Sequence, residues 1–196
     1  MKYLNQLEYA HIPYRTNTRD DSVPEEEKNS TVALSGCGLC CVAMTVELLT
    51  DKELSLTECV RLAEESGASH AVGTDMNVFG PIIAEKFDLE FIPNKDLEAA
   101  VAHLRDGGVI IGYMGVPEGC DVGLFTESGH YVCVISTDGE EFCFLDPSYS
   151  PEKFLHPKRI GRVKTSHAPY LYCDIKTFDS ETRPNRVKYF MFRRKK

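Results

Sequence analysis

The sequence predicts an α+β protein in which a helical layer packs on an antiparallel sheet. Helical patterns fill residues 37 to 107, and strand patterns dominate after residue 109, where two apolar runs are joined as a hairpin. The chain has 196 residues, of which 42% are hydrophobic, enough to bury a core as one domain. We therefore expect a single domain over 1–196, with 151–196 as a C-terminal extension whose placement the sequence leaves open.

The first long helix is expected to begin at Cys37 and to be buried. From 39 to 49 only Thr45 and Glu47 interrupt a run of apolar residues, so the helix would be apolar on most of its circumference. Helices of that kind belong in the centre of a domain. The residues just before it, 31–34, could form a very short strand.

Further helices are expected between residues 55 and 107, as packing elements without chemical roles. Three segments carry the pattern: 55–67 with Ser55 as N-cap, 75–87 with a break or kink at Gly80-Pro81, and 94–107 with Asn94 as N-cap.

The strands are expected at 109–114, 130–135 and 141–145. The loop between the first two is long enough to border a substrate cleft. Two later apolar runs, 170–175 and 187–192, look like strands that extend the same sheet.

Cys37 is the leading candidate for a reactive thiol. A cysteine in the first turn of a helix lies near unpaired backbone N–H groups and the positive end of the helix dipole, which lower the pKa of the thiol. Gly36 and Gly38 on either side would let another chain approach the sulfur closely. The alternative is a buried, inert cysteine, because free cysteine is among the most buried residue types.

Among the six histidines, His130 is the best candidate for a base that activates Cys37. It stands where a loop enters an apolar strand, and Asp146 follows the next strand, so both fall at the open end of one hairpin. A two-residue turn would put them on opposite faces, whereas a three-residue loop at Thr137–Gly139 would set them directly opposite each other. We expect the second arrangement, in which Asp146 orients the imidazole. The alternatives are a strand-end histidine and a turn aspartate.

Four short motifs together resemble the papain-like cysteine peptidases, in the branch typified by bacteriocin-processing peptidases. They are Ile12–Asn17, Gly36-Cys37-Gly38 before an apolar helix, Gly129–Val132, and Asp146-Pro147. The resemblance covers roughly residues 9 to 150. It implies a papain-like fold with Cys37 as nucleophile, His130 as base and Asp146 as the residue that orients the base. It also suggests peptide substrates cut after small residues such as Gly-Gly.

The chain departs from that family at two places. Where the family has a glutamine that helps to form the oxyanion hole, the nearest amide is Asn17, which is one methylene shorter. After Gly-Cys-Gly, the residues Leu39-Cys40 replace the family's proline and small residue. The resulting Cys37-x-x-Cys40 is also a redox motif.

The sequence therefore predicts a cysteine peptidase, or a related thiol amide hydrolase, that acts through a thioester acyl-enzyme on a peptide or protein substrate. Two other classes stay open. One is a catalytically inactive peptide-binding module, and the other is a thiol-disulfide redox protein that uses Cys37 and Cys40.

Composition limits the partners and the compartment. The net charge is −8, and the basic residues concentrate between 183 and 196, where they either dock on the acidic body or are solvated; for the last four residues we expect the solvated state. Because the rest of the chain is acidic, we do not expect nucleic acid as a partner. No apolar run is long enough to span a membrane and no signal peptide is evident, so we expect a cytoplasmic protein with no membrane partner. The eight cysteines are expected to be free thiols, and we expect no metal and no cofactor.

Overall fold

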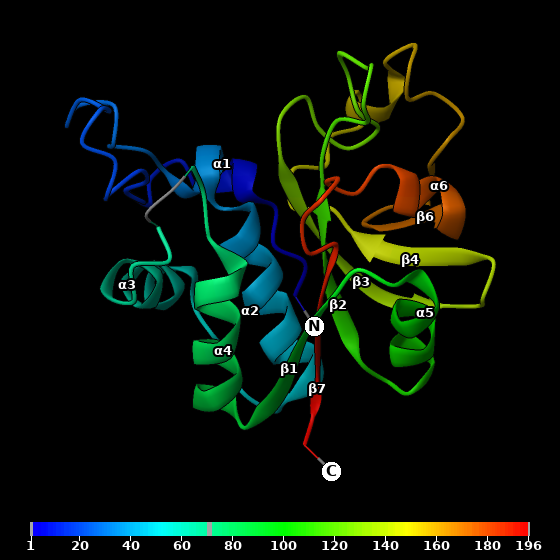
Figure 1. Ribbon diagram of the computed structural model, residues 1–196, viewed down its shortest axis with the longest axis horizontal. Coiled ribbons are helices and arrows are strands. Elements are labelled where there is room, and N and C mark those ends of the chain that lie inside the picture. Colours follow the sequence, from blue (N-terminus) through cyan, green and yellow to red (C-terminus); the bar gives the residue numbers. More distant parts are fainter. Residues whose placement is uncertain (1, 70–71, 196) are drawn as a thin grey trace.

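The computed structural model describes residues 2–69 and 72–195 and has an α+β architecture, as the sequence predicts (Figure 1). Helices packed on a seven-stranded antiparallel sheet make up the protein. The strands are β1 (Leu89–Asn94), β2 (Val109–Met114), β3 (His130–Thr137), β4 (Glu141–Leu145), β5 (Lys164–His167), β6 (Tyr170–Asp174) and β7 (Tyr189–Arg194). The α-helices are α1 (Val32–Ser35), α2 (Cys37–Leu49), α3 (Leu56–Glu65), α4 (Met76–Phe87), α5 (Leu97–Arg105) and α6 (Ile175–Ser180), with 3-10 turns η1 (Gln6–Glu8) and η2 (Lys153–Leu155).

The C-terminal segment completes the sheet. The strand order is β1-β7-β2-β3-β4-β6-β5, so the last strand of the chain, β7, lies between β1 and β2. Strands β6 and β5 extend the other edge, beyond β4. Residues 151–196 therefore supply three strands to one common sheet, and their two apolar runs form strands as the sequence predicts.

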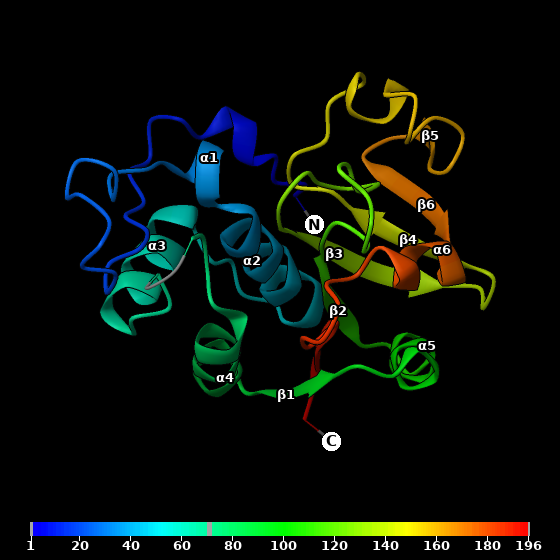
Figure 2. The ribbon, with the colours of Figure 1, turned by 45° about the horizontal axis from the view of Figure 1, so that its top comes forward.

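Helices α2 and α4 pack on one face of the sheet, and α3 packs on the outer side of α2 (Figure 2). Ten of the thirteen residues of α2 are buried, which confirms the expected burial on most of its circumference. Its side chains pack against sheet residues such as Ile111, Cys133 and Phe190 in one apolar core. This packing fixes the N-terminus of α2 beside the beginning of β3.

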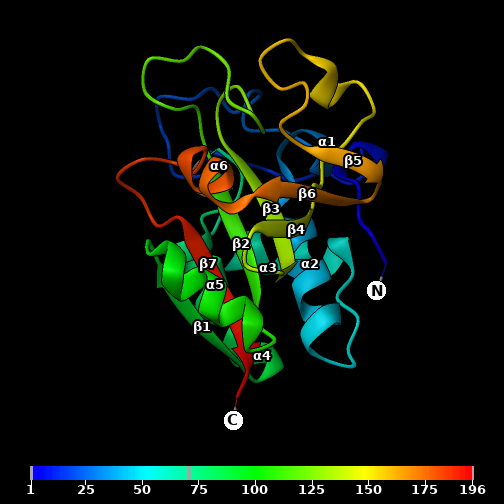
Figure 3. The same cartoon turned by 90° about the vertical axis from the view of Figure 1, so that its right-hand side faces the viewer.

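Helices α5 and α6 cover the opposite face (Figure 3). Alternate residues of β3 supply the two cores, with Cys133 on the α2 side and Val132 and Val134 on the α5 and α6 side. Phe178 of α6 lies at the centre of the second core, where it packs against Phe125, Phe142 and Phe144.

Three local predictions differ from the structure in whole or in part. The possible strand at 31–34 is a helical turn, and only Thr31 pairs, in an isolated bridge with Pro13. Helix α4 continues through Pro81 without a break, although proline removes one backbone donor. The N-cap of α5 is Asp96 rather than Asn94, which ends β1 and accepts from the N–H groups of the following turn.

At the C-terminus, Arg193 and Lys195 pair with carboxylates of the acidic body, so the solvated state expected for the last four residues is wrong for these two. Arg193 Nε lies 2.6 Å from a carboxylate oxygen of Glu90, and Lys195 Nζ lies 2.7 Å from Asp88. Across residues 2–69 and 72–195, no helix has the length and apolar character needed to cross a membrane.

Candidate active site

Cys37 is the first residue of α2, where the chain turns from α1 through Gly36. A Cβ atom on Gly36 would lie 2.5 Å from the carbonyl oxygen of Val32, so this close turn requires glycine. At Gly38, a Cβ would approach the side chains of Thr74 and Tyr131 to 3.0 and 3.2 Å. Gly36 thus allows the close turn between α1 and α2, and Gly38 allows Thr74 and Tyr131 to pack against the N-terminus of α2.

His130 and Asp146 form a hydrogen bond at the edge of the sheet where β3 begins and β4 ends. His130 Nε2 lies 2.7 Å from Asp146 Oδ1, and both side chains are buried. Since Nε2 is engaged by the carboxylate, Nδ1 is the ring nitrogen left for Cys37.

The hairpin reaches this contact in a different register from the predicted one. Cys133 pairs with Leu145, so continuing the register by one pair sets Asp146 opposite Val132, not opposite His130. The loop spans 138–140, and a bulge lies between Val134 and Ser136. Because the shift along the strand is two residues, His130 stays on the same face as Asp146 and reaches it diagonally.

Asp146 is held by more partners than the sequence indicated. Its side chain is fully buried, and Lys153 Nζ lies 2.6 Å from Oδ2. The backbone N–H of Ser148 donates to Oδ1 at 2.9 Å, and the Ser148 hydroxyl lies 3.2 Å from both Oδ1 and His130 Nε2. Lys153 also donates to that hydroxyl at 2.7 Å.

Lys153 was missed at the sequence level because nothing in its local pattern marks it. It lies in a polar stretch after Pro151 that looks like an ordinary loop. A lysine is rarely buried unless it is paired, and here η2 turns its ammonium group inward onto the carboxylate.

The electrostatics of the site favour a thiolate and an imidazolium. Burial raises the pKa of the Cys37 thiol, but hydrogen bonds from His130, Tyr131 N–H and Gly38 N–H, with the charge of His130, bring the pKa below its usual value. Burial and the charge of Lys153 lower the pKa of His130, yet Asp146 and Cys37 raise it above its ordinary value. Burial raises the pKa of Asp146, while Lys153 and His130 together hold it well below the usual range.

A cavity of about 530 Å³ opens beside Cys37. Its lining includes His130, the aromatic side chains of Tyr113 and Tyr131, and the loop residues Ser128 and Gly129. We expected the loop 115–129 to border the cleft, and its residues Ser128 and Gly129 do line this cavity. Leu34 and Val72 also line the cavity and are 77% and 82% exposed, so they offer apolar surface to a ligand.

The structure does not bring Asn17 to this cavity. Asn17 adopts a left-handed conformation, with φ of 53°, and its carbonyl oxygen accepts from Asp20 N–H in a turn. It is not among the described residues that line the cavity beside Cys37. Tyr14 of the same motif is fully buried, and its hydroxyl lies 2.8 Å from Thr74 Oγ1, so it supports the segment that packs on Gly38.

The second cysteine of the Cys-x-x-Cys motif lies in a different environment from the first. Cys37 is partly exposed, whereas Cys40 is fully buried and burial raises the pKa of its thiol. All eight cysteines are free thiols. Within the described part of the chain, no three His, Cys, Asp or Glu side chains gather as they would around a metal ion.

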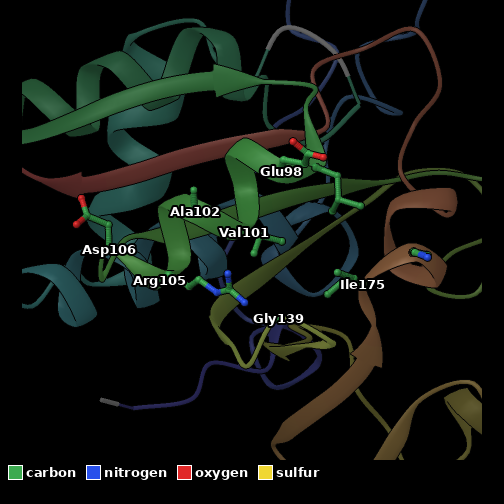
Figure 4. Close-up of a pocket in the computed structure, with 9 residues that line it drawn as sticks. Glu98, Val101, Ala102, Arg105, Asp106, Gly139 and Ile175 are labelled. Carbon is green, nitrogen blue, oxygen red and sulfur yellow. The ribbon is translucent and has the colours of Figure 1, made fainter.

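A larger cavity lies elsewhere, and no cysteine or histidine is among the described residues that line it. It measures about 680 Å³ and lies between α5, the turn at Gly139 and the beginning of α6 (Figure 4). Its charged side chains, such as Glu98 and Arg105, are of mixed sign. Cys37 and His130 both line the smaller cavity, which is therefore the candidate site.

Comparison of the chain with protein-family models gave no match, and comparison with curated proteins gave none either.

Proposed function

We propose that the protein is a thiol hydrolase of the papain-like type that cleaves a peptide or other amide through Cys37, His130 and Asp146. The observation that carries the proposal is the chain of contacts from the thiol through the imidazole to a buried carboxylate. His130 hydrogen-bonds to Cys37 on one side, and its Nε2 lies 2.7 Å from Asp146 on the other. A nucleophile, a base and a group that orients the base are the parts that acyl transfer requires.

In the proposed reaction, His130 holds the proton of Cys37 as an imidazolium and the thiolate attacks the substrate carbonyl carbon. The C–S bond forms while the carbonyl becomes an oxyanion, which the first-turn backbone N–H of Cys37 can stabilise because a helix leaves that donor without an intrahelical partner. The imidazolium then protonates the leaving amine, and the C–N bond breaks to leave a thioester. Water activated by His130 attacks the thioester and releases the acid, which restores the thiol.

A papain-like arrangement is supported by the place of each group in the fold. The nucleophile begins a buried helix, the base begins a strand, and the cavity lies where the helix meets the edge of the sheet. The redox alternative is less well supported, because burial raises the pKa of the Cys40 thiol and so disfavours the thiolate that would resolve a mixed disulfide at Cys37. Asn17 has no part in the proposed mechanism.

Acylation by p-nitrophenyl acetate tests the proposal without knowledge of the natural substrate. The wild-type protein should show a burst of p-nitrophenolate, an acetyl group on Cys37 in the intact mass, and slow deacylation that returns the free thiol. We expect Cys37→Ala to abolish the burst and His130→Ala to slow it by about a hundredfold or more. Acetylation of Cys37 no faster than that of free cysteine would overturn the proposal.

A further inference from the structure

The cavity beside Cys37 continues into a second one. The second cavity measures about 250 Å³ and shares Tyr113, Tyr131 and Arg183 with the first, together with Val72 and Thr74. It ends at Arg186, which is exposed. The two cavities thus form one groove, which runs from Cys37 across the stacked rings of Tyr113 and Tyr131 to Arg186.

The shared wall of the groove is built to hold Arg183 in place. Its backbone N–H donates to the carbonyl oxygen of Tyr113 at 2.8 Å, at the end of β2. Its guanidinium lies 5.5 Å from the ring centroid of Tyr113 and donates through Nη1 to the Ser128 carbonyl oxygen at 3.2 Å. These contacts leave the positive charge over the aromatic floor of the groove.

Carboxylates do not balance the charge of this groove, because the lining of the second cavity holds two arginines and one acidic residue. Among the described residues, neither Arg183 nor Arg186 has a carboxylate oxygen within 4 Å, in contrast to Arg61, Arg162 and Arg193. The acidic residue in the lining is Asp75, whose Oδ1 accepts from Asn77 N–H at the N-terminus of α4. In a chain with a net charge of −8, two arginines gathered along a groove that leads to the thiol favour an anionic ligand.

We propose that this groove binds an acidic peptide, with Arg183 and Arg186 pairing with side-chain carboxylates beside the bond that Cys37 attacks. The inference rests on the proposed function for the reaction at Cys37 and adds the substrate class. The apolar surface of Leu34 and Val72 beside Cys37, followed by the two arginines, suits a peptide in which a small or apolar residue is followed along the chain by acidic ones.

Peptide binding is measured by fluorescence anisotropy in a Cys37→Ala background, so that no reaction step is needed. The probes are two labelled hexapeptides that differ only in having two glutamates or two glutamines. We expect the glutamate peptide to bind about three- to tenfold more tightly, and the preference to shrink as salt is raised from 50 to 500 mM. Arg183→Gln and Arg186→Gln should each reduce the preference, whereas Arg105→Gln, the same change on exposed α5, should leave it intact. Equal binding of the two peptides, or a preference equally reduced by Arg105→Gln, would overturn the proposal.

Alkylation of the native thiol gives an independent readout. The Cys37 thiolate displaces iodide from both anionic iodoacetate and neutral iodoacetamide. The ratio of the two rate constants therefore reports the electrostatic potential near the thiolate. One unit charge about 6 Å away in water changes such a ratio roughly threefold, so Arg183→Gln should lower it by about that factor and Arg105→Gln should not. An unchanged ratio in Arg183→Gln contradicts the proposal even if Cys37 is a reactive thiolate. Slow iodoacetamide labelling in every variant would instead count against the proposed function.

Discussion

Replacement of Lys153 by Met should reveal how strongly the buried ion pair with Asp146 supports the fold and the base. Lys153 Nζ is one of two charged donors to a fully buried carboxylate, at 2.6 Å, and its own side chain is only 9% exposed. Removing one partner of a buried pair costs about 3 to 5 kcal/mol. Because His130 and Ser148 still donate to Asp146, we expect the lower end, about 3 kcal/mol at pH 7. For a chain of this size that lowers the melting temperature by roughly 6 to 12 °C.

The same substitution should change the ionisation of the base. The positive charge of Lys153 lowers the pKa of His130, so Lys153→Met should raise it, and Lys153→Arg should restore it. The pKa of Asp146 lies below its unfolded value, so its pairing stabilises the fold fully above about pH 4 and less as the pH falls further.

Chemical denaturation at pH 7 gives the stability change, and NMR titration of the His130 ring gives the pKa. Lys95→Met, at an exposed lysine, is the matched control. It should change the free energy of unfolding by no more than about 0.5 kcal/mol, and the pKa of His130 by no more than the equivalent shift. If Lys153→Met were as stable as that control and left the pKa of His130 unchanged, the buried pair would not have the role assigned to it.

Two further substitutions test the local structure around the thiol. Gly36→Ala places a Cβ 2.5 Å from the Val32 carbonyl oxygen and should destabilise the fold by about 1 to 3 kcal/mol, measured by urea denaturation. Because φ of Gly36 is −92°, this loss arises from the clash and not from left-handed backbone strain, and a loss below about 0.5 kcal/mol would contradict the packing argument. Cys40→Ser places a hydroxyl at a fully buried position, so it should lower the melting temperature. At a temperature where both proteins are folded, the rate constant of Cys37 alkylation should stay within about twofold of the wild-type value. A loss of alkylation as large as that in His130→Ala would favour the redox interpretation.

Local patterns were sufficient to predict the elements that carry the candidate triad. The apolar run after Cys37 predicted the buried helix α2, and the turn residues after the first strand of the hairpin predicted β4 with its observed bounds. His130 and Asp146 were paired from their positions at one end of that hairpin. The pairing is present in the structure although the predicted register was wrong, because a shift of two residues preserves the face of a strand.

Features that depend on contacts distant in sequence were not predictable in the same way. Strand β7 is inserted between β1 and β2, which depends on pairings across about 80 to 100 residues. Lys153 and Arg183 both belong to the segment after residue 150, where the local sequence resembles loops. Their roles arise from a carboxylate and a tyrosine ring that other parts of the chain supply. Burial and ion pairing of this kind leave no periodic signal in a single sequence.

The pH dependence of Cys37 alkylation by iodoacetamide tests the central claim most directly. The pKa of Cys37 is lowered and that of His130 is raised, and both shifts favour a thiolate beside an imidazolium. We expect rapid labelling of Cys37, followed by peptide mass spectrometry, down to about pH 5 in the wild type, and a shift to the pH range of an ordinary thiol, near pH 8.5, in His130→Ala. Slow labelling below pH 8 in the wild type, or a profile that His130→Ala leaves unchanged, would contradict the thiolate-imidazolium pair.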